Sequence, residues 1–361
     1  MKTQRISKQQ ALLIAITSIT AAVFKPLFRD FLLWSGNGSW ASIILATGFS
    51  VVILLLVLRL AARFPRQSAA EYLPVIWGKL IGYPLAFILL LTFFLKGAFT
   101  LRNVSEFFVT AILPETPISA VMIIMLILVA GGILAQLEGI VRFNQLALPI
   151  IIFGFALVFL GSLPRFSGWN LLPAFNKGYR GLLHPFQTAS SYLLNSTFIM
   201  FVYPLIVDPE RIAKEACKML AVAGGLMLAI YLNIVLFLGS SLGQVFTWPY
   251  LAVVENIQIG VERGEAIFMV VWMLAAFVTI SLFLYIFALG TTQLIPGIKL
   301  WWVGIAAIPA AAYVALLPNN LPSALVDHTL LHEYALYLQV AIPLLSLGLA
   351  IVRRQRGEQF E

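Results

Sequence analysis

Runs of apolar residues long enough to cross a membrane recur along the whole chain, separated by short polar segments. An α-helix needs about 20 such residues to span a bilayer. We therefore predict ten membrane-spanning helices, at residues 9–34, 40–62, 84–113, 118–137, 146–163, 183–207, 220–242, 265–289, 301–317 and 334–352. The more polar stretch EYLPVIWGKLIGYP, after the second span, is predicted to form a short amphipathic helix along the membrane surface.

The first span is interrupted by a cation and a proline, Lys25 and Pro26. Proline lacks an N–H and disfavours helical geometry at the preceding residue, and a buried charge is costly in hydrocarbon. Opened backbone is tolerated at this depth only where it faces protein or a water-filled cavity. The pattern predicts two half-helices, 9–21 and 26–34, with a break between Thr20 and Lys25. The alternative is a proline-kinked helix whose lysine reaches an interface.

The sixth span carries a second polar interruption, flanked by Pro185 and Pro204. Its polar residues are Ser190, Ser191, Asn195, Ser196 and Thr197. Small hydroxyls in such a span either bond carbonyls of their own helix or join two helices. Alternatively, the segment is unwound and offers hydroxyls and free N–H groups to a small polar ligand. Asn195 favours the second interpretation, because a buried amide needs several partners.

The two interruptions lie at matching positions in two halves of five spans each. In transporter folds, such a match points to a binding site between inverted repeats. We therefore expect one membrane domain over residues 1–361, a first repeat over 9–163, a second repeat over 183–352 and a cytoplasmic tail over 353–361.

The composition fits an all-α polytopic membrane protein. Of the 361 residues, 61% are hydrophobic and 11% are charged, and the mean hydropathy is +0.97. Soluble domains carry about 25% charged residues. The single cysteine, Cys217, excludes an internal disulfide and a multi-cysteine metal site.

The net charge of +8 follows a membrane topology and is no sign of nucleic-acid binding. With both termini in the cytoplasm, 15 of the 23 Lys and Arg residues fall on the inner side. The outer cations are Arg29, Arg165, Lys177, Arg180 and Arg263, and those inside spans are Lys25, Lys96 and Arg102. The inner excess supports this orientation. The outer loop 164–181 fits least well, because it holds three of the five outer cations.

Other polar residues inside spans are candidates for structure or function. In span three, Arg102 and Glu106 are four residues apart and are predicted to pair on one helix face. Lys96 lies deeper, without a partner within one turn, so it either stands in for a coupling cation or faces a carboxylate ligand. In span eight, Thr279 and Ser281 either bond their own helix or contribute to a site.

Motifs for metals, nucleotides and covalent catalysis are weak or absent. His328 and His332 are four apart with Glu333 next, but no third ligand follows at a recognised spacing. No phosphate-binding glycine loop and no Ser or Cys nucleophile with an adjacent His is visible. The glycines of GGIL and AGGL lie in apolar spans, where small residues let helices pack closely. We expect no metal, no cofactor and no enzymatic activity.

Several stretches together resemble the membrane-embedded B subunit of spore germinant receptors (GerAB-like proteins), in the amino acid–polyamine–organocation transporter superfamily. The resemblance covers nearly the whole chain in order and length. It is carried by ISKQQALLIAI, FPRQSAAEYLPVIWGKLIGYP, LRNVSEFF…LPETP, NLLPAFNKG, WPYLAVVENIQIGVERGEAIFMVVWMLAAFVTISLFLY and IPLLSLGLAIVRRQR.

The resemblance implies a LeuT-like fold with broken helices 1 and 6, and a small-molecule germinant, commonly an amino acid, bound at the breaks. It also implies partner A and C subunits and a place in the inner membrane of a bacterial spore. Carried over by position, the ligand site comprises Ile19, Thr20, Ala21, Ser196, Thr197, Phe198 and Thr279. Lys25, Lys96 and Asn195 join these candidates from the sequence pattern.

The chain departs from the family pattern at both breaks. Family members often have a glycine-rich break in span one, where this chain has Ile19, Thr20 and Ala21, and many carry Gly-Glu in span six, where it has Ser196–Phe198. The missing glycines narrow the space for ligand approach. The missing acid removes a natural partner for an amine, and Lys25 suits an anionic or neutral ligand.

Three hypotheses follow. The first is a germinant receptor subunit that senses a small, amino acid-like molecule through a transporter fold. The second is a secondary transporter of amino acids or related solutes, which would show net flux of its ligand. The third is a polytopic membrane enzyme, which the absence of paired acids and of a metal cluster disfavours.

Overall fold

The chain folds into a bundle of helices, seen here in a computed structural model. The structure describes residues 5–21, 26–175, 177–209, 212–257, 264–318 and 320–357. Its first half contains α1 (Lys8–Thr20), α2 (Leu27–Ser35), α3 (Ser39–Arg63), α4 (Ala69–Trp77), α5 (Lys79–Ala111), α6 (Ile118–Leu134) and α7 (Gln136–Ser162). Its second half contains α8 (Leu183–Leu193), α9 (Ile199–Val202), α10 (Ile212–Gly243), α11 (Pro249–Glu255), α12 (Gly264–Leu294), α13 (Leu300–Leu316) and α14 (Leu321–Val352).

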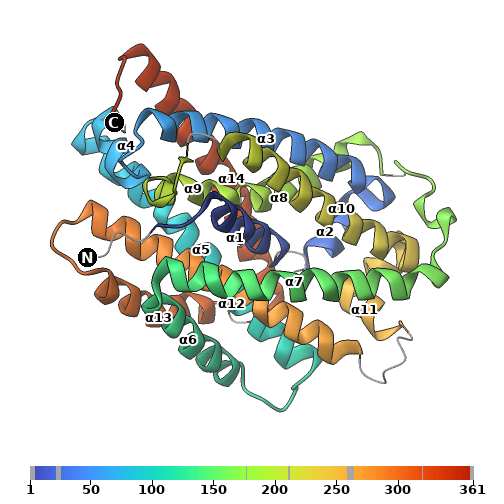
Figure 1. The fold of residues 1–361 in the computed structure, drawn as a ribbon. Helices are drawn as coiled ribbons and strands as arrows, with labels where there is room; N and C mark the ends of the chain where they lie inside the picture. Colours follow the sequence, from blue (N-terminus) through green and yellow to red (C-terminus); the bar gives the residue numbers. More distant parts are fainter. Residues whose placement is uncertain are drawn as a thin grey trace.

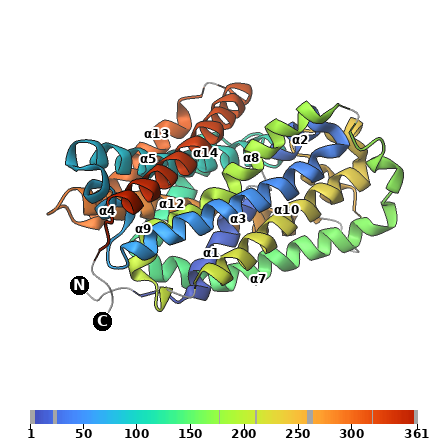
Figure 2. The ribbon, with the colours of Figure 1, turned by 90° about the horizontal axis from the view of Figure 1, so that it is seen from above.

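The helices fit a polytopic membrane protein. Six segments of the described chain are long and apolar enough to cross a membrane, at 27–63, 79–111, 136–165, 212–243, 268–294 and 329–352. Helices α6 and α13 are shorter apolar helices. The chain enters α1 and leaves α14 at the same end of the bundle (Figure 2). An even number of crossings, as predicted, has this result.

Both predicted interruptions are present. Helix α1 ends at Thr20 and α2 begins at Leu27, which confirms the two half-helices. In span six, α8 ends at Leu193, a tight 3₁₀ turn follows over Leu194–Phe198, and α9 lasts a single turn. The tighter turn changes the hydrogen-bonding pattern of the backbone at this point in the span.

Some helices extend beyond the predicted apolar runs. Helix α14 begins at Leu321, not at 334, and Asn320 caps its first turn by accepting a bond from the Ser323 N–H at 2.9 Å. The predicted span 334–352 lies within this helix, and the helix continues before it because polar residues such as His332 are buried against neighbouring helices. Helices α7 and α10 likewise begin earlier than predicted, with charged residues on exposed first turns.

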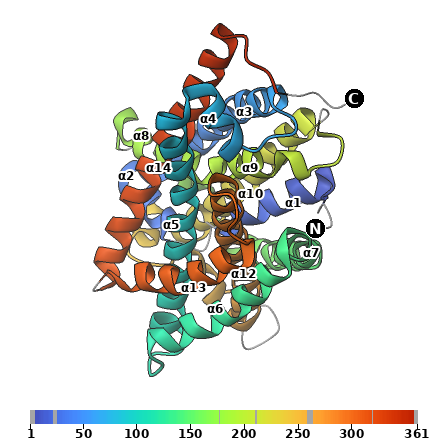
Figure 3. The ribbon, with the colours of Figure 1, turned by 90° about the vertical axis from the view of Figure 1, so that its left-hand side faces the viewer.

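The predicted surface segment, residues 71–84, is divided between two helices: its first half lies in α4, and its second half, from Lys79, forms the start of α5. Helix α4 packs against α5 (Figures 1 and 3). Ser68 and Glu71 form a capping box at its start, a reciprocal bond between side chains and backbone that fixes a helix N-terminus. At Gly82 of α5 the backbone of α4 comes so close that an added Cβ would lie 2.6 Å from the Leu73 carbonyl oxygen and from the Pro74 nitrogen. The absent side chain therefore sets the distance between the two helices.

Small residues also allow close helix packing in the two glycine pairs noted in the sequence. A Cβ at Gly132 of α6 would lie 2.8 Å from Ser281 Oγ of α12. At Gly224 of α10 it would overlap Thr47 of α3. Both glycines thus bring helices together as expected for small residues in membrane spans.

Two chain ends are tied to the rest of the molecule where α1 begins and α14 ends. Ile6 pairs with Ile206, just after span six, through bonds of 2.9 Å (Ile6 N–H to Leu205 O) and 3.0 Å (Val207 N–H to Ile6 O). The tail after α14 is held by the Gly357 N–H, which donates to Arg63 O at 2.9 Å. The backbone after α9 is therefore fixed to the segment before α1.

Two cations of the loop 164–181 donate hydrogen bonds to backbone carbonyls at the ends of helices. Lys177 Nζ donates to the carbonyls of Leu32 at 3.2 Å and Leu33 at 2.6 Å, in the last turn of α2. Arg165 Nη1 donates to Asn256 O at 2.7 Å, just after α11. The last carbonyls of a helix lack intrahelical partners and carry partial negative charge. These bonds give a structural reason for positive charge in the loop that fitted the charge rule least well.

We expect Lys177→Met to lower the free energy of unfolding by about 1 kcal/mol, because the end of α2 loses its cationic cap. Thermal unfolding in detergent measures this change. Arg180→Met is the matched control, an exposed cation of the same loop. Equal melting temperatures for the two variants would contradict a capping role for Lys177.

Candidate functional site

The two interrupted spans meet at Asn195, in the 3₁₀ turn between α8 and α9. The Asn195 amide nitrogen donates to the Ser18 carbonyl near the end of α1 at 3.4 Å, and its Oδ1 accepts from Lys96 Nζ at 2.8 Å. The Asn195 side chain, in the break of span six, thereby contacts the last turn of α1 and helix α5. The sequence prediction that Asn195 needs several partners is in agreement with these contacts.

Lys96 of α5 lies within this junction, with 1% of its surface exposed. Besides Asn195, its ammonium group donates to the Ser191 carbonyl at 3.0 Å and to Gln339 Oε1 at 3.1 Å. Its partners therefore come from α8, the 3₁₀ turn and α14.

The hydroxyl groups predicted to bind a ligand bond within their own spans, unlike Asn195 and Lys96, which bond between helices. Each hydroxyl donates to a carbonyl three or four residues earlier in its own span: Thr20 to Ile16 at 3.0 Å, Ser196 to Leu193 at 2.8 Å, Thr197 to Leu194 at 2.7 Å and Thr279 to Ala275 at 2.7 Å. This is the local bonding that small hydroxyls adopt inside helices. Ligand contact by these groups would require a change in the rotamer or in the backbone.

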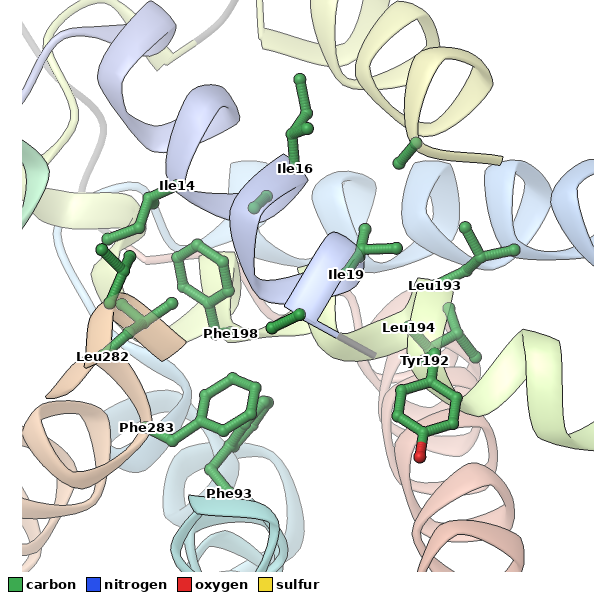
Figure 4. Close-up of a cluster of buried hydrophobic side chains, with 14 of the residues drawn as sticks. Ile14, Ile16, Ile19, Phe93, Tyr192, Leu193, Leu194, Phe198, Leu282 and Phe283 are labelled. Atoms are coloured by element: carbon green, nitrogen blue, oxygen red, sulfur yellow. The ribbon is translucent and has the colours of Figure 1, made fainter. Parts of the chain in front are cut away.

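Apolar side chains fill the space between the breaks and helices α5 and α12. Figure 4 shows Phe198 beside Ile14 of α1 and Leu282 of α12, with Ile19 facing Leu193. The Phe93 and Phe283 rings, from α5 and α12, pack 5.5 Å apart. Candidates Ile19, Ala21 and Phe198 are all buried. The junction therefore has an apolar body, and Asn195 and Lys96 form its polar edge.

Helix α14 supplies two buried polar residues that the sequence analysis did not assign to the site, His332 and Gln339. His332 Nδ1 lies 3.0 Å from Ser191 Oγ, and its ring stacks on Tyr192 with centroids 4.0 Å apart. The two residues are seven apart, so they lie on one face of the helix. Two polar residues at this spacing in an apolar run were the sequence signal that could have assigned them to the site.

Other predictions fall outside the junction. Arg102 and Glu106 form the predicted ion pair, at 2.8 Å, and Arg102 also donates to Ala315 O at the end of α13. Ser281 packs against Gly132. Lys25 lies outside the described residues. Within the described part of the chain, no group of three potential metal-ligating side chains is found.

Comparisons with known proteins agree with this fold. A family model described as spore germination protein matches residues 5–324. Spore germination protein YndE of Bacillus subtilis (strain 168) is 25% identical over 365 residues, which cover 99% of each chain. Spore germination protein GerLB of Bacillus cereus is 25% identical over 338 residues, 89% of this chain and 87% of that protein.

Among solved structures, MhsT in complex with L-phenylalanine superposes with a TM-score of 0.66 at 14% identity, over 99% of this chain and 91% of that one. A Na⁺-coupled sialic acid symporter superposes with a TM-score of 0.64 at 15% identity, over 94% and 79%. These similarities confirm the predicted LeuT-like transporter fold. Since the family model covers most of the sequence, the chain belongs to the spore germination protein family.

Proposed function

We propose that this chain is the germinant-sensing membrane subunit of a spore germinant receptor, and that it binds a small molecule at the junction of its two interrupted spans. The observation that supports this most is the Asn195 bridge, because one amide joins the end of α1, the break of span six and helix α5. A ligand that competes for these bonds would act on both breaks at once. Family membership supports the role in germination.

The side chains at the junction favour a ligand with an apolar part and a polar or anionic part. Phe198 and Ile19 provide apolar surface, and Asn195 and Lys96 provide hydrogen-bond donors or positive charge. An amino acid-like molecule has this combination. Because apolar side chains fill the junction, we expect the ligand to stabilise a more open arrangement of the breaks that is already part of the equilibrium.

The proposed setting is the inner membrane of the spore, with both termini in the cytoplasm and with A and C subunits as partners. The inner excess of Lys and Arg supports the orientation. Co-purification of the tagged chain with co-expressed A and C subunits tests the assembly. Recovery of the chain alone under mild detergent conditions would count against a stable complex.

A thermal-shift screen of the purified protein against the twenty amino acids, nucleosides and sugars tests the binding proposal. A ligand that binds the folded state raises the melting temperature by mass action, by an amount that grows with concentration. We expect a hit among the amino acids or closely related molecules. The absence of any hit for the chain, alone and with its partner subunits, would contradict the proposal.

Thr279 and Thr291 offer a matched pair for locating the site. Both lie on α12, and each donates to a carbonyl four residues earlier at 2.7 Å. Only Thr279 is a candidate at the breaks. We expect Thr279→Val to weaken binding of the hit about tenfold, as for one lost hydrogen bond of about 1.4 kcal/mol. Thr291→Val is expected to bind like the parent, and equal affinities for all three proteins would place the ligand elsewhere.

A transporter with the same fold would carry its ligand across the membrane. Uptake of the labelled hit into proteoliposomes distinguishes the two functions. Under the sensor proposal, the ligand binds the reconstituted protein without net accumulation. Accumulation that depends on the protein and on an ion gradient would favour the secondary transporter.

A further inference from the structure

The surroundings of Lys96 resemble a binding site for a monovalent cation. Its nitrogen is held by three oxygens at 2.8 to 3.1 Å: a backbone carbonyl, that of Ser191, and two amide oxygens, those of Asn195 and Gln339. All three are neutral oxygens. Neutral carbonyl oxygens of this kind replace the hydration shell of alkali cations in selective pores.

As a charged ammonium, Lys96 has an acceptor for each of its three N–H donors. The Asn195 amide is oriented by its second bond, in which its nitrogen donates to Ser18 O, so Oδ1 is the atom that faces Lys96. The Ser191 carbonyl is only an acceptor. With Gln339 Oε1 as the third acceptor, the nitrogen uses three N–H donors, and a neutral amine has only two.

The three oxygens come from parts of the chain that are far apart in sequence but converge on the break of span six. Ser191 is in the last turn of α8, Asn195 is in the 3₁₀ turn, and Gln339 is in the middle of α14. A positive charge at their centre offsets the repulsion of three converging oxygen dipoles. Without that charge, we expect the break and α14 to move apart.

We infer that the Lys96 ammonium takes the place of a free monovalent cation between the oxygens of Ser191, Asn195 and Gln339. The closed break of span six therefore needs no dissolved ion. A tethered charge is always present, whereas a free ion would have to be captured from solution. Helix α5 thereby contributes a positioning residue that holds the break against α14. This inference does not depend on the identity of the germinant or on its binding.

Removing the Lys96 side chain should make the three oxygens accessible to small cations. In Lys96→Ala the three oxygens remain and the side-chain volume is left open. We expect this variant to have a lower melting temperature than the parent, and ethylammonium chloride or potassium chloride at ~100 mM to restore at least half of the loss. Tetramethylammonium chloride at equal ionic strength has no N–H and is the salt control. The parent should respond alike to all three salts.

Lys96→Met separates charge from packing, because it fills much of the space without a charge. We expect it to be less stable than the parent and to gain nothing from ethylammonium, since the space is occupied. A Lys96→Met variant as stable as the parent would overturn the inference. So would a Lys96→Ala variant that no salt restores beyond the tetramethylammonium control.

A second set of variants tests the charge if Lys96→Ala does not fold. Gln339→Glu places a carboxylate beside the ammonium and should raise the melting temperature, or leave it unchanged, in the parent. Introduced together with Lys96→Met, the same carboxylate is buried without its cation and should lower the melting temperature sharply. Equal effects of Gln339→Glu in both backgrounds would show that Lys96 carries no charge between these oxygens, and would overturn the inference.

Discussion

Gly82→Ala is expected to be the most destabilising single-methyl addition in the first half of the chain. The new Cβ would lie 2.6 Å from the Leu73 oxygen and the Pro74 nitrogen, which are backbone atoms of α4. Backbone atoms have no alternative rotamer, so α4 must shift away from α5. Overpacking of this kind costs about 3 kcal/mol. The melting temperature in detergent measures the loss.

Gly48→Ala is the matched control, since it lies inside α3 with nothing within 4 Å of a new Cβ. In a helix interior, alanine is preferred over glycine by about 1 kcal/mol, so this variant should be as stable as the parent or more stable. If Gly82→Ala unfolds at the parent temperature, α4 is not fixed to α5 as the structure has it.

Asn195→Leu is the second change with a large expected effect. It removes the acceptor for Lys96 and the donor to Ser18 O together. A buried ammonium that loses one of its acceptors, and a buried carbonyl that loses its donor, should cost about 3 kcal/mol in the free energy of unfolding. We also expect the variant to lose its response to the germinant, because the two breaks are no longer joined.

Asn103→Leu on α5 is the control for this prediction. Asn103 is equally buried, but its amide donates to Phe99 O in its own helix at 2.9 Å. Only a local bond is lost, so the cost should be near 1 kcal/mol. Equal losses for the two variants would mean that the contacts of Asn195 between helices contribute nothing beyond a local bond.

The break of span one could be predicted because its cause is local. A proline forbids a helical hydrogen bond at its own position, whatever surrounds it. The same holds for the pair of Arg102 and Glu106, whose separation of four residues brings them together on any helix. Features of this kind are encoded within one or two turns.

The environment of Lys96 could not be predicted in this way. Its acceptors come from Ser191, Asn195 and Gln339, up to 243 positions away along the chain. No local pattern states which of several polar residues in separate spans will meet. The transporter fold limits the possible partners of Lys96 to residues on helices that line the junction. Which of these residues bond Lys96 depends on side-chain contacts that only the structure shows.

The full length of α14 could not be predicted for a related reason. The last span was placed at 334–352 because apolar windows measure the preference for lipid, and the residues before 334 are more polar. A helix packed against other helices can bury polar groups that bond one another, as His332 and Ser191 do at 3.0 Å. Burial against protein and burial in lipid therefore leave different patterns in a sequence.

The measurement that tests the central claim most directly is a titration of the germinant hit into the parent protein and into Ser196→Leu. Ser196 is fully buried in the 3₁₀ turn next to Asn195, so a leucine there fills the junction where the ligand is proposed to bind. We expect the parent melting temperature to rise with ligand concentration, and the Ser196→Leu variant to show no rise at 100 times the parent Kd. A variant that responds with the parent Kd would contradict a binding site at the junction of the two interrupted spans.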